Sequence, residues 1–102
     1  MADFVEATTL EQLAPGTSMV VHIADTDVAL FNVEGEVYAI NDTCVHAGSS
    51  LAAGKVQGKI VTCRAHGFRF DLTTGWVPGG EGYGVASYPV RVEDGKILVA
   101  VG

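Results

Sequence analysis

Residues 44–66 read CVHAGSSLAAGKVQGKIVTCRAH and contain both cysteines of the chain, together with two of its three histidines. The four residues form two pairs: a C-x-H pair at Cys44 and His46, and a C-x-x-H pair at Cys63 and His66. Sixteen residues separate His46 from Cys63. Each pair can place one sulfur and one imidazole nitrogen on a tight loop. Two such loops brought together would make a closed site with four ligands.

Four interpretations of these pairs compete. The cysteines could be small buried apolar residues without a ligand. The set of two sulfurs and two nitrogens could hold a structural zinc ion, although zinc sites usually pair like ligands as C-x₂₋₄-C and H-x₃₋₅-H. A [2Fe–2S] cluster could take both cysteines on one iron and both histidines on the other, in which case each loop would give one ligand to each iron. A disulfide between Cys44 and Cys63 is the fourth, and disulfides are uncommon in the cytosol.

Charge divides the 102-residue chain into segments. Residues 1–42 carry eight acids and no base, residues 43–70 carry four bases and no acid, and the net charge is −6. This acidity argues against nucleic acid or an anionic membrane as a partner. No apolar run reaches the roughly 20 residues of a membrane span, and the first residues do not resemble a secretory signal. We therefore expect a cytoplasmic protein without membrane association.

Short apolar, β-branched runs with turn signals between them predict an all-β fold. The expected strands cover residues 19–23, 28–33, 36–40, 59–62, 90–93 and 97–101. Glycines at Gly35 and Gly95 mark two hairpin turns. A capping-box pattern predicts one helical turn after Thr8 or Thr9. Many short strands of this kind favour a sandwich or a barrel.

The two ligand pairs and their surroundings resemble the Rieske family. The family signature is C-x-H, a gap of about this length, and C-x-x-H, and further resemblance extends over residues 66–71, 74–75 and 88–95. The resemblance implies a single Rieske domain over residues 1–102. Its base would be an antiparallel β-sandwich from residues 1–42 and 71–102, with a small cluster-binding subdomain inserted at 43–70. A proline loop at 75–84 would cover the cluster.

The resemblance also assigns a role to each candidate ligand. Cys44 and Cys63 would bind one iron of a single [2Fe–2S] cluster as thiolates. His46 and His66 would bind the other iron as neutral imidazoles. All four positions of the family's ligand pattern are present in this sequence.

Five further residues have expected roles. The family pattern implies that Gly48 and Gly67 permit turns of the ligand loops and N–H donation toward the cluster sulfurs. Pro78 would lie in the covering loop. We expect Trp76 to be part of the core. His22 lies in a strand pattern and matches no motif, so we expect a structural or surface role for it.

The resemblance distinguishes two branches of the family. The high-potential respiratory branch has an extra cysteine in each ligand loop, and the matching positions here are Ser49 and Ala65. That branch also places a serine and a tyrosine hydroxyl near the cluster, where this chain has Phe68 and Phe70. Because hydrogen bonds to the cluster or its sulfur ligands raise the reduction potential, we expect a value near the low end of the Rieske range of roughly −150 to +300 mV.

The sequence therefore looks like a Rieske-type ferredoxin of a bacterial ring-hydroxylating dioxygenase system. Such a protein is an electron-transfer component rather than an enzyme. It would carry single electrons from a flavin-dependent reductase to a terminal oxygenase or another redox acceptor. Two alternatives stay open: a Rieske-like small subunit of a larger reductase, such as a nitrite reductase, and a structural zinc-binding module.

Overall fold

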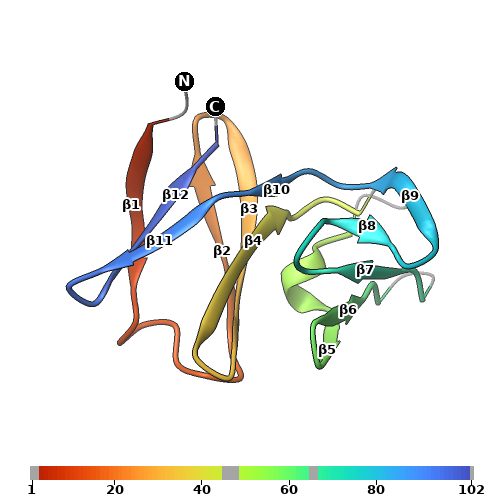
Figure 1. Cartoon of the computed structure of the whole chain (residues 1–102), viewed down its shortest axis with the longest axis horizontal. Helices are drawn as coiled ribbons and strands as arrows, with labels where there is room; N and C mark the ends of the chain where they lie inside the picture. Colours follow the sequence, from red (N-terminus) through yellow and green to blue (C-terminus); the bar gives the residue numbers. More distant parts are fainter. Residues whose placement is uncertain (1–2, 45–48, 65–66, 102) are drawn as a thin grey trace.

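The computed structural model describes residues 3–44, 49–64 and 67–101. Within these ranges the chain is almost entirely β-structure, arranged in four antiparallel sheets (Figure 1). The predicted all-β fold is confirmed. No helix in the described ranges is long and apolar enough to cross a membrane.

Two larger sheets form the framework of the fold (Figure 1). The first sheet has the order β1 (Phe4–Thr9), β12 (Lys96–Ala100), β11 (Val90–Glu93). The second sheet has the order β10 (Ser87–Tyr88), β4 (Glu36–Asn41), β3 (Thr26–Val33), β2 (Ser18–Ile23). The hairpins β2–β3, β3–β4 and β11–β12 pair sequence neighbours, and β1 joins the last strand of the chain.

Two smaller sheets stand beside the second sheet, on the right in Figure 1. One has the order β5 (Lys55–Gln57), β6 (Ile60–Thr62), β7 (Arg69–Asp71), and a short 3₁₀ helix, η1 (Leu51–Ala53), precedes it. The other is the hairpin β8 (Trp76–Val77) and β9 (Gly80–Gly84). Both lie on the chain between β4 and β10, so the segment that carries the cysteines is inserted into the framework.

Strand β3 is buried on both faces. Successive side chains of a strand point to opposite faces. Val28 and Leu30 accordingly lie in one hydrophobic core. Ala29 and Phe31 lie in the other. This double burial explains why β3 reads as a continuous apolar run rather than as an alternation.

The two cores occupy opposite sides of the second sheet. The first core lies between the framework sheets and contains Leu13, Val28, Leu30, Ala39, Ile97 and Val99. The second core joins the sheet to the inserted segment and contains Ala29, Phe31, Ile40, Cys44, Leu51, Val61, Cys63, Phe70, Leu72 and Val85. Both cysteines therefore belong to the core that attaches the insertion.

Two polar contacts also join the insertion to the second sheet. Ser18 Oγ, at the start of β2, donates a hydrogen bond of 2.8 Å to the carbonyl of Ala52 in η1. The Lys59 ammonium lies 6.0 Å from the ring centroid of Tyr38 on β4. The insertion is thus held at both η1 and the β5–β6 turn.

The helical turn expected from the sequence is found, whereas several of the shortest strands were not expected. The expected helical turn is present as one turn, in which Leu13 N donates to Thr9 O at 3.1 Å and Gln12 N to Thr9 Oγ1 at 3.3 Å. Strands β5, β7, β8 and β10 are only two or three residues long, too short for an alternation to be read. Trp76 is 40% exposed, so the expectation that it belongs to the core is wrong. The domain boundaries at 42/43 and 70/71 stay a prediction.

The β2–β3 turn offers a test of the backbone. Ala24 has φ of +50°, and the left-handed region costs an alanine roughly 1–2 kcal/mol while asparagine adopts it routinely. We expect Ala24→Asn to raise the free energy of unfolding by about 0.5–1 kcal/mol in urea denaturation. Ala86→Asn is the control, because Ala86 is exposed and has no positive φ. Equal effects of the two substitutions would contradict this account.

Candidate metal centre

The first cysteine begins a loop just after β4. Cys44 N donates a hydrogen bond of 2.9 Å to the carbonyl of Ser49, and Thr43 and Ser50 form an antiparallel bridge outside it. The loop is therefore closed at its base by backbone pairing. The Cys44 side chain is only 1% exposed and points into the second core.

The second cysteine begins a loop just after β6. Cys63 N donates a hydrogen bond of 2.7 Å to the carbonyl of Phe68, and Gly67 N donates one of 3.0 Å to the carbonyl of Cys63. Gly67 has φ of +74°, a conformation that glycine adopts at no steric cost. This observation supports the turn-forming role expected for Gly67. Cys63 is also 1% exposed.

The two loops are closed by hydrogen bonds of the same type. In each, the amide of the cysteine donates to the carbonyl five residues further along the chain, Ser49 in one loop and Phe68 in the other. Both cysteines lie in the same apolar core and, among the described residues, no disulfide joins them. The structure thus places two buried thiols from separate loops in one apolar core. Two such sulfur donors suit a metal centre that takes thiolates from two loops.

Three of the expected site residues, His46, Gly48 and His66, lie outside the described residues. The four-ligand set therefore stays a prediction. Within the described ranges, no group of three or more histidines, cysteines and carboxylates could hold a metal ion. His22 lies away from the cysteine loops, where its exposed Nδ1 is 2.8 Å from Asp27 Oδ1 across the β2–β3 hairpin.

Comparison with known proteins is consistent with this geometry. The family of the Rieske [2Fe-2S] domain matches residues 3–89. The chain belongs to this family. A Rieske protein carries an iron–sulfur cluster, and the family name specifies a [2Fe–2S] cluster. The prediction of a Rieske fold is confirmed as well, because the match spans both framework and insertion.

Individual relatives of this Rieske domain include ferredoxins of dioxygenase systems. The biphenyl dioxygenase ferredoxin subunit of Pseudomonas sp. (strain KKS102) is 36% identical, over 94% of this chain and 90% of that protein. The solved ferredoxin of carbazole 1,9a-dioxygenase from Nocardioides aromaticivorans IC177 is 30% identical with a TM-score of 0.89, and the match covers 99% of this chain and 100% of that chain. The predicted resemblance to dioxygenase ferredoxins is confirmed.

A second kind of neighbour is a solved structure from Mycobacterium tuberculosis, assigned as an NADH-dependent nitrite reductase small subunit. It is 26% identical with a TM-score of 0.90, and the match covers 100% of this chain and 97% of that chain. The Rieske fold of this chain is thus shared by two kinds of redox component.

Asp42 organises the first ligand loop of this Rieske domain. Its side chain is 7% exposed, and its Oδ1 accepts hydrogen bonds from Ser50 Oγ at 2.8 Å and from Ala52 N at 2.9 Å. Its carbonyl accepts one from Leu51 N at 2.7 Å. The residue two positions before Cys44 therefore holds the far end of the loop. Sequence reasoning missed this role, for which the only signal was an isolated acid between an apolar strand and the first cysteine.

The β8–β9 hairpin is attached to the Rieske core at a close backbone crossing. Val85 N donates a hydrogen bond of 2.8 Å to the carbonyl of Gly75, and Val85 is in the second core. A Cβ on Gly75 would collide with the carbonyl of Val85, and one on Gly84 with the carbonyl of Gly75. The glycines therefore set how closely this hairpin approaches. Pro78 lies exposed between its strands, and its proposed covering of the cluster stays a prediction.

The Asp42 contacts can be tested by truncation. We expect Asp42→Ala to lower the free energy of unfolding by about 1–3 kcal/mol, because the partly buried amide of Ala52 loses its acceptor, and to lower the iron content of the purified protein. Ser50→Ala removes one of the two hydrogen bonds and leaves the amide paired, so it serves as the control. Denaturant titration and iron analysis would measure both effects. The same stability and iron content in the two variants would refute the role of Asp42.

Proposed function

We propose that this Rieske protein is a one-electron carrier of a ring-hydroxylating oxygenase system. It receives single electrons from a flavin-dependent reductase and delivers them to a terminal oxygenase. The observation that carries the proposal is the pair of matched loops, each of which begins with a buried cysteine of the same core. The relatives named as dioxygenase ferredoxins support the same function.

We assign the ligands from the family pattern. Cys44 and Cys63 hold one iron as thiolates, while His46 and His66 hold the other. The bound [2Fe–2S] cluster supplies reversible storage of one electron. The chain supplies two loops closed by hydrogen bonds, an apolar core around the cysteines, and the hydrogen bonds of Asp42 to the first loop. Support for Gly48, Gly67 and Pro78 as loop residues comes from the same pattern and, for Gly67, from its backbone conformation.

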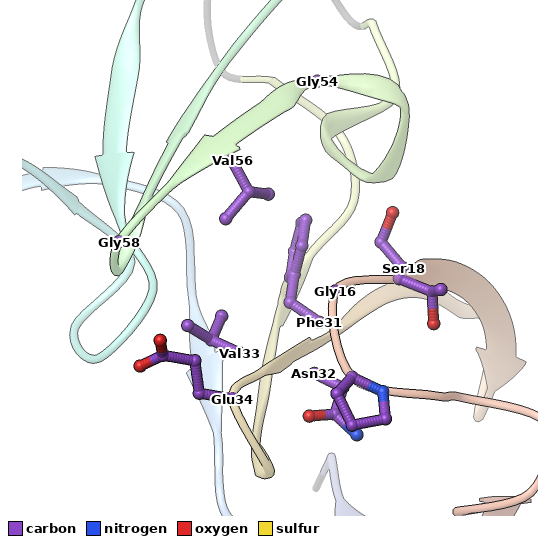
Figure 2. A pocket seen from close by; sticks show the side chains of 11 residues that line it. Gly16, Ser18, Phe31, Asn32, Val33, Glu34, Gly54, Val56 and Gly58 are labelled. Carbon is purple, nitrogen blue, oxygen red and sulfur yellow. The ribbon is translucent and has the colours of Figure 1, made fainter.

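Two cavities among the described residues have linings that include neither cysteine. The larger one, of about 390 Å³, lies between the framework and the β5–β6 hairpin (Figure 2). Its walls include Phe31, Val33 and Val56. Neither cysteine lines this cavity or the second one, near Tyr38 and Tyr88. A bound molecule in either cavity would therefore be separated from the cysteine loops by side chains of the core.

A small subunit of a nitrite reductase is the second candidate, and the structure from Mycobacterium tuberculosis favours it. The two functions differ in what the protein binds in the cell. A stable complex with a large catalytic subunit on purification would support the reductase subunit. Recovery of the protein alone, with reduction by a flavin reductase, would support the carrier.

The proposed function requires a cluster of stated composition. We expect a red-brown protein with two iron and two sulfide per chain, whose visible absorption is bleached by dithionite. Metal analysis and absorption spectra would measure this. A colourless protein that holds one equivalent of zinc would instead establish a structural zinc module.

The histidine assignment can be tested by exchange of one ligand. We expect His66→Cys to remove the Rieske-type electron paramagnetic resonance signal, or to replace it with one like that of a plant-type ferredoxin, because the second iron then has a thiolate ligand. His22→Cys is the matched control and should leave the signal unchanged. Survival of the wild-type signal in His66→Cys would show that the ligand assignment is wrong.

The reduction potential can be tested at Phe70. This side chain is fully buried in the core that contains both cysteines. We expect Phe70→Tyr to raise the reduction potential, because a hydroxyl donor near the cluster or its sulfur ligands stabilises the reduced state. Phe4→Tyr, in the framework, is the control for the added hydroxyl. A redox titration that finds the same potential in both variants would contradict the influence of residue 70.

A further inference from the structure

The six cations of the chain fall into two separate groups. Four lie in residues 43–70, where there is no acid, and the other two are Arg91 and Lys96 on the framework. The framework pair is partly balanced, because Arg91 Nε lies 3.6 Å from Glu93 and Lys96 Nζ lies 4.0 Å from Glu6. Residues 43–70 are therefore a cationic segment of a protein whose net charge is −6.

Two of the insertion's cations lie in one row across the small sheet. Lys55 on β5 pairs with Thr62 on β6, and Thr62 pairs with Arg69 on β7. Directly paired residues of an antiparallel sheet share a face, so the Lys55 and Arg69 side chains flank Thr62 on the same face. Two strand spacings separate their backbones by about 10 Å. The next row, which includes Val61 and Phe70, turns to the core.

This row lies at the end of the sheet where the second cysteine loop begins. Thr62 immediately precedes Cys63, and Arg69 immediately follows Phe68, whose carbonyl accepts the hydrogen bond from Cys63 N. Arg64, the next residue of the loop, is also exposed. We call Lys55, Arg64 and Arg69 the basic row. Lys59 lies at the opposite end of β6, over Tyr38.

The acid that follows the basic row in sequence is Asp71, two residues beyond Arg69 on β7, and its carboxylate accepts hydrogen bonds from Thr73 N at 2.8 Å and Thr73 Oγ1 at 2.6 Å. All three side chains of the basic row are exposed, and no ion pair joins any of them to a described residue. The carboxylate of Asp42 is buried and already accepts two hydrogen bonds. Like charges held together on a surface cost free energy unless an opposite charge approaches them. The row is thus a preformed site for anions of a partner.

Two aromatic side chains of the β8–β9 hairpin are exposed next to the small sheet that carries Lys55 and Arg69. β8 packs against β7 (Figure 1). Trp76 on β8 is 40% exposed and Tyr83 on β9 is 51% exposed. Tryptophan, tyrosine and arginine are the residues that contribute most to protein interfaces. Arg69 on β7 and Trp76 on the neighbouring β8 are thus exposed residues of the types that dominate protein interfaces.

We propose that the basic row, beside the β8–β9 hairpin with its exposed Trp76, forms the surface on which this carrier docks to an acidic face of its redox partner protein. The inference rests on the proposed function and adds the charge of the partner. The acidic framework repels the same partner face, so the protein approaches with the cysteine loops forward. Charge segregation then selects the productive orientation, although the net charge alone would oppose association.

The first experiment measures the sign of the salt dependence with a small anionic oxidant. The dithionite-reduced holoprotein is mixed with ferricyanide at increasing ionic strength. We expect the second-order rate constant to fall with salt, because the local field at the cysteine loops attracts the anion. A protein that presented only its net charge of −6 would show a rate that rises with salt.

Two double variants separate local charge from net charge. Lys55→Gln with Arg69→Gln, and Arg91→Gln with Lys96→Gln, both remove two positive charges from the chain. We expect the first variant to react with ferricyanide about tenfold more slowly at low ionic strength, with loss of the inverse salt dependence. The second variant should retain the wild-type sign. Equal behaviour of the two variants would overturn the proposal.

A second experiment tests the surface without electron transfer. Poly-L-glutamate serves as an acidic polypeptide probe, and the emission of Trp76, the single tryptophan, reports its binding. We expect a saturable emission change in wild type that salt reverses and that the Lys55→Gln, Arg69→Gln variant lacks. No change in wild type would overturn the docking surface even if electron transfer is normal. A protein with no reducible cluster would refute the proposed function but leave this binding arm decisive.

Discussion

The second sheet stabilises the molecule because both of its faces are buried. Its strand β3 supplies Val28 and Leu30 to the framework core and Ala29 and Phe31 to the core of the insertion. The insertion is therefore not a separate module tethered by a linker, since it packs against the second sheet through β3 and through Ile40 on β4. The two cysteines lie in this second core, so the position of both thiols follows from the packing that joins the two parts.

Within that arrangement, local devices act on the ligand loops. Two loops of different sequence are closed by the same kind of hydrogen bond, from the cysteine amide to the carbonyl five residues ahead. Asp42 holds the far end of the first loop, and the glycine crossing at Gly75 and Gly84 holds the β8–β9 hairpin near the second. Each of these contacts depends on very few residues: one carboxylate at Asp42, and the absence of a side chain at Gly75 and Gly84.

The sequence predicted the fold class and the cysteine loops because their signals are local. Ligand spacing, hairpin glycines and the apolar run of β3 can all be recognised within a few residues. The β8–β9 hairpin could not be predicted, because β8 is only two residues long. The exposure of Trp76 could not be predicted either, because it depends on whether another strand, distant in sequence, covers the side chain. Asp42 was missed for the same reason: its partners Ser50 and Ala52 are defined only once the loop has closed. The histidine ligands stay predictions of the family pattern.

The double burial of β3 also makes cofactor loading a property of the whole fold. A cluster held by the cysteine loops would stabilise the second core, and through β3 it would also stabilise the first. Binding to the native state raises stability by mass action, and metal binding of this kind is folding free energy. A chain without its cluster would open more often, framework included, and would be exposed to proteolysis. Proteases that recognise only unfolded chains would therefore remove the protein that lacks its cluster and cannot transfer electrons.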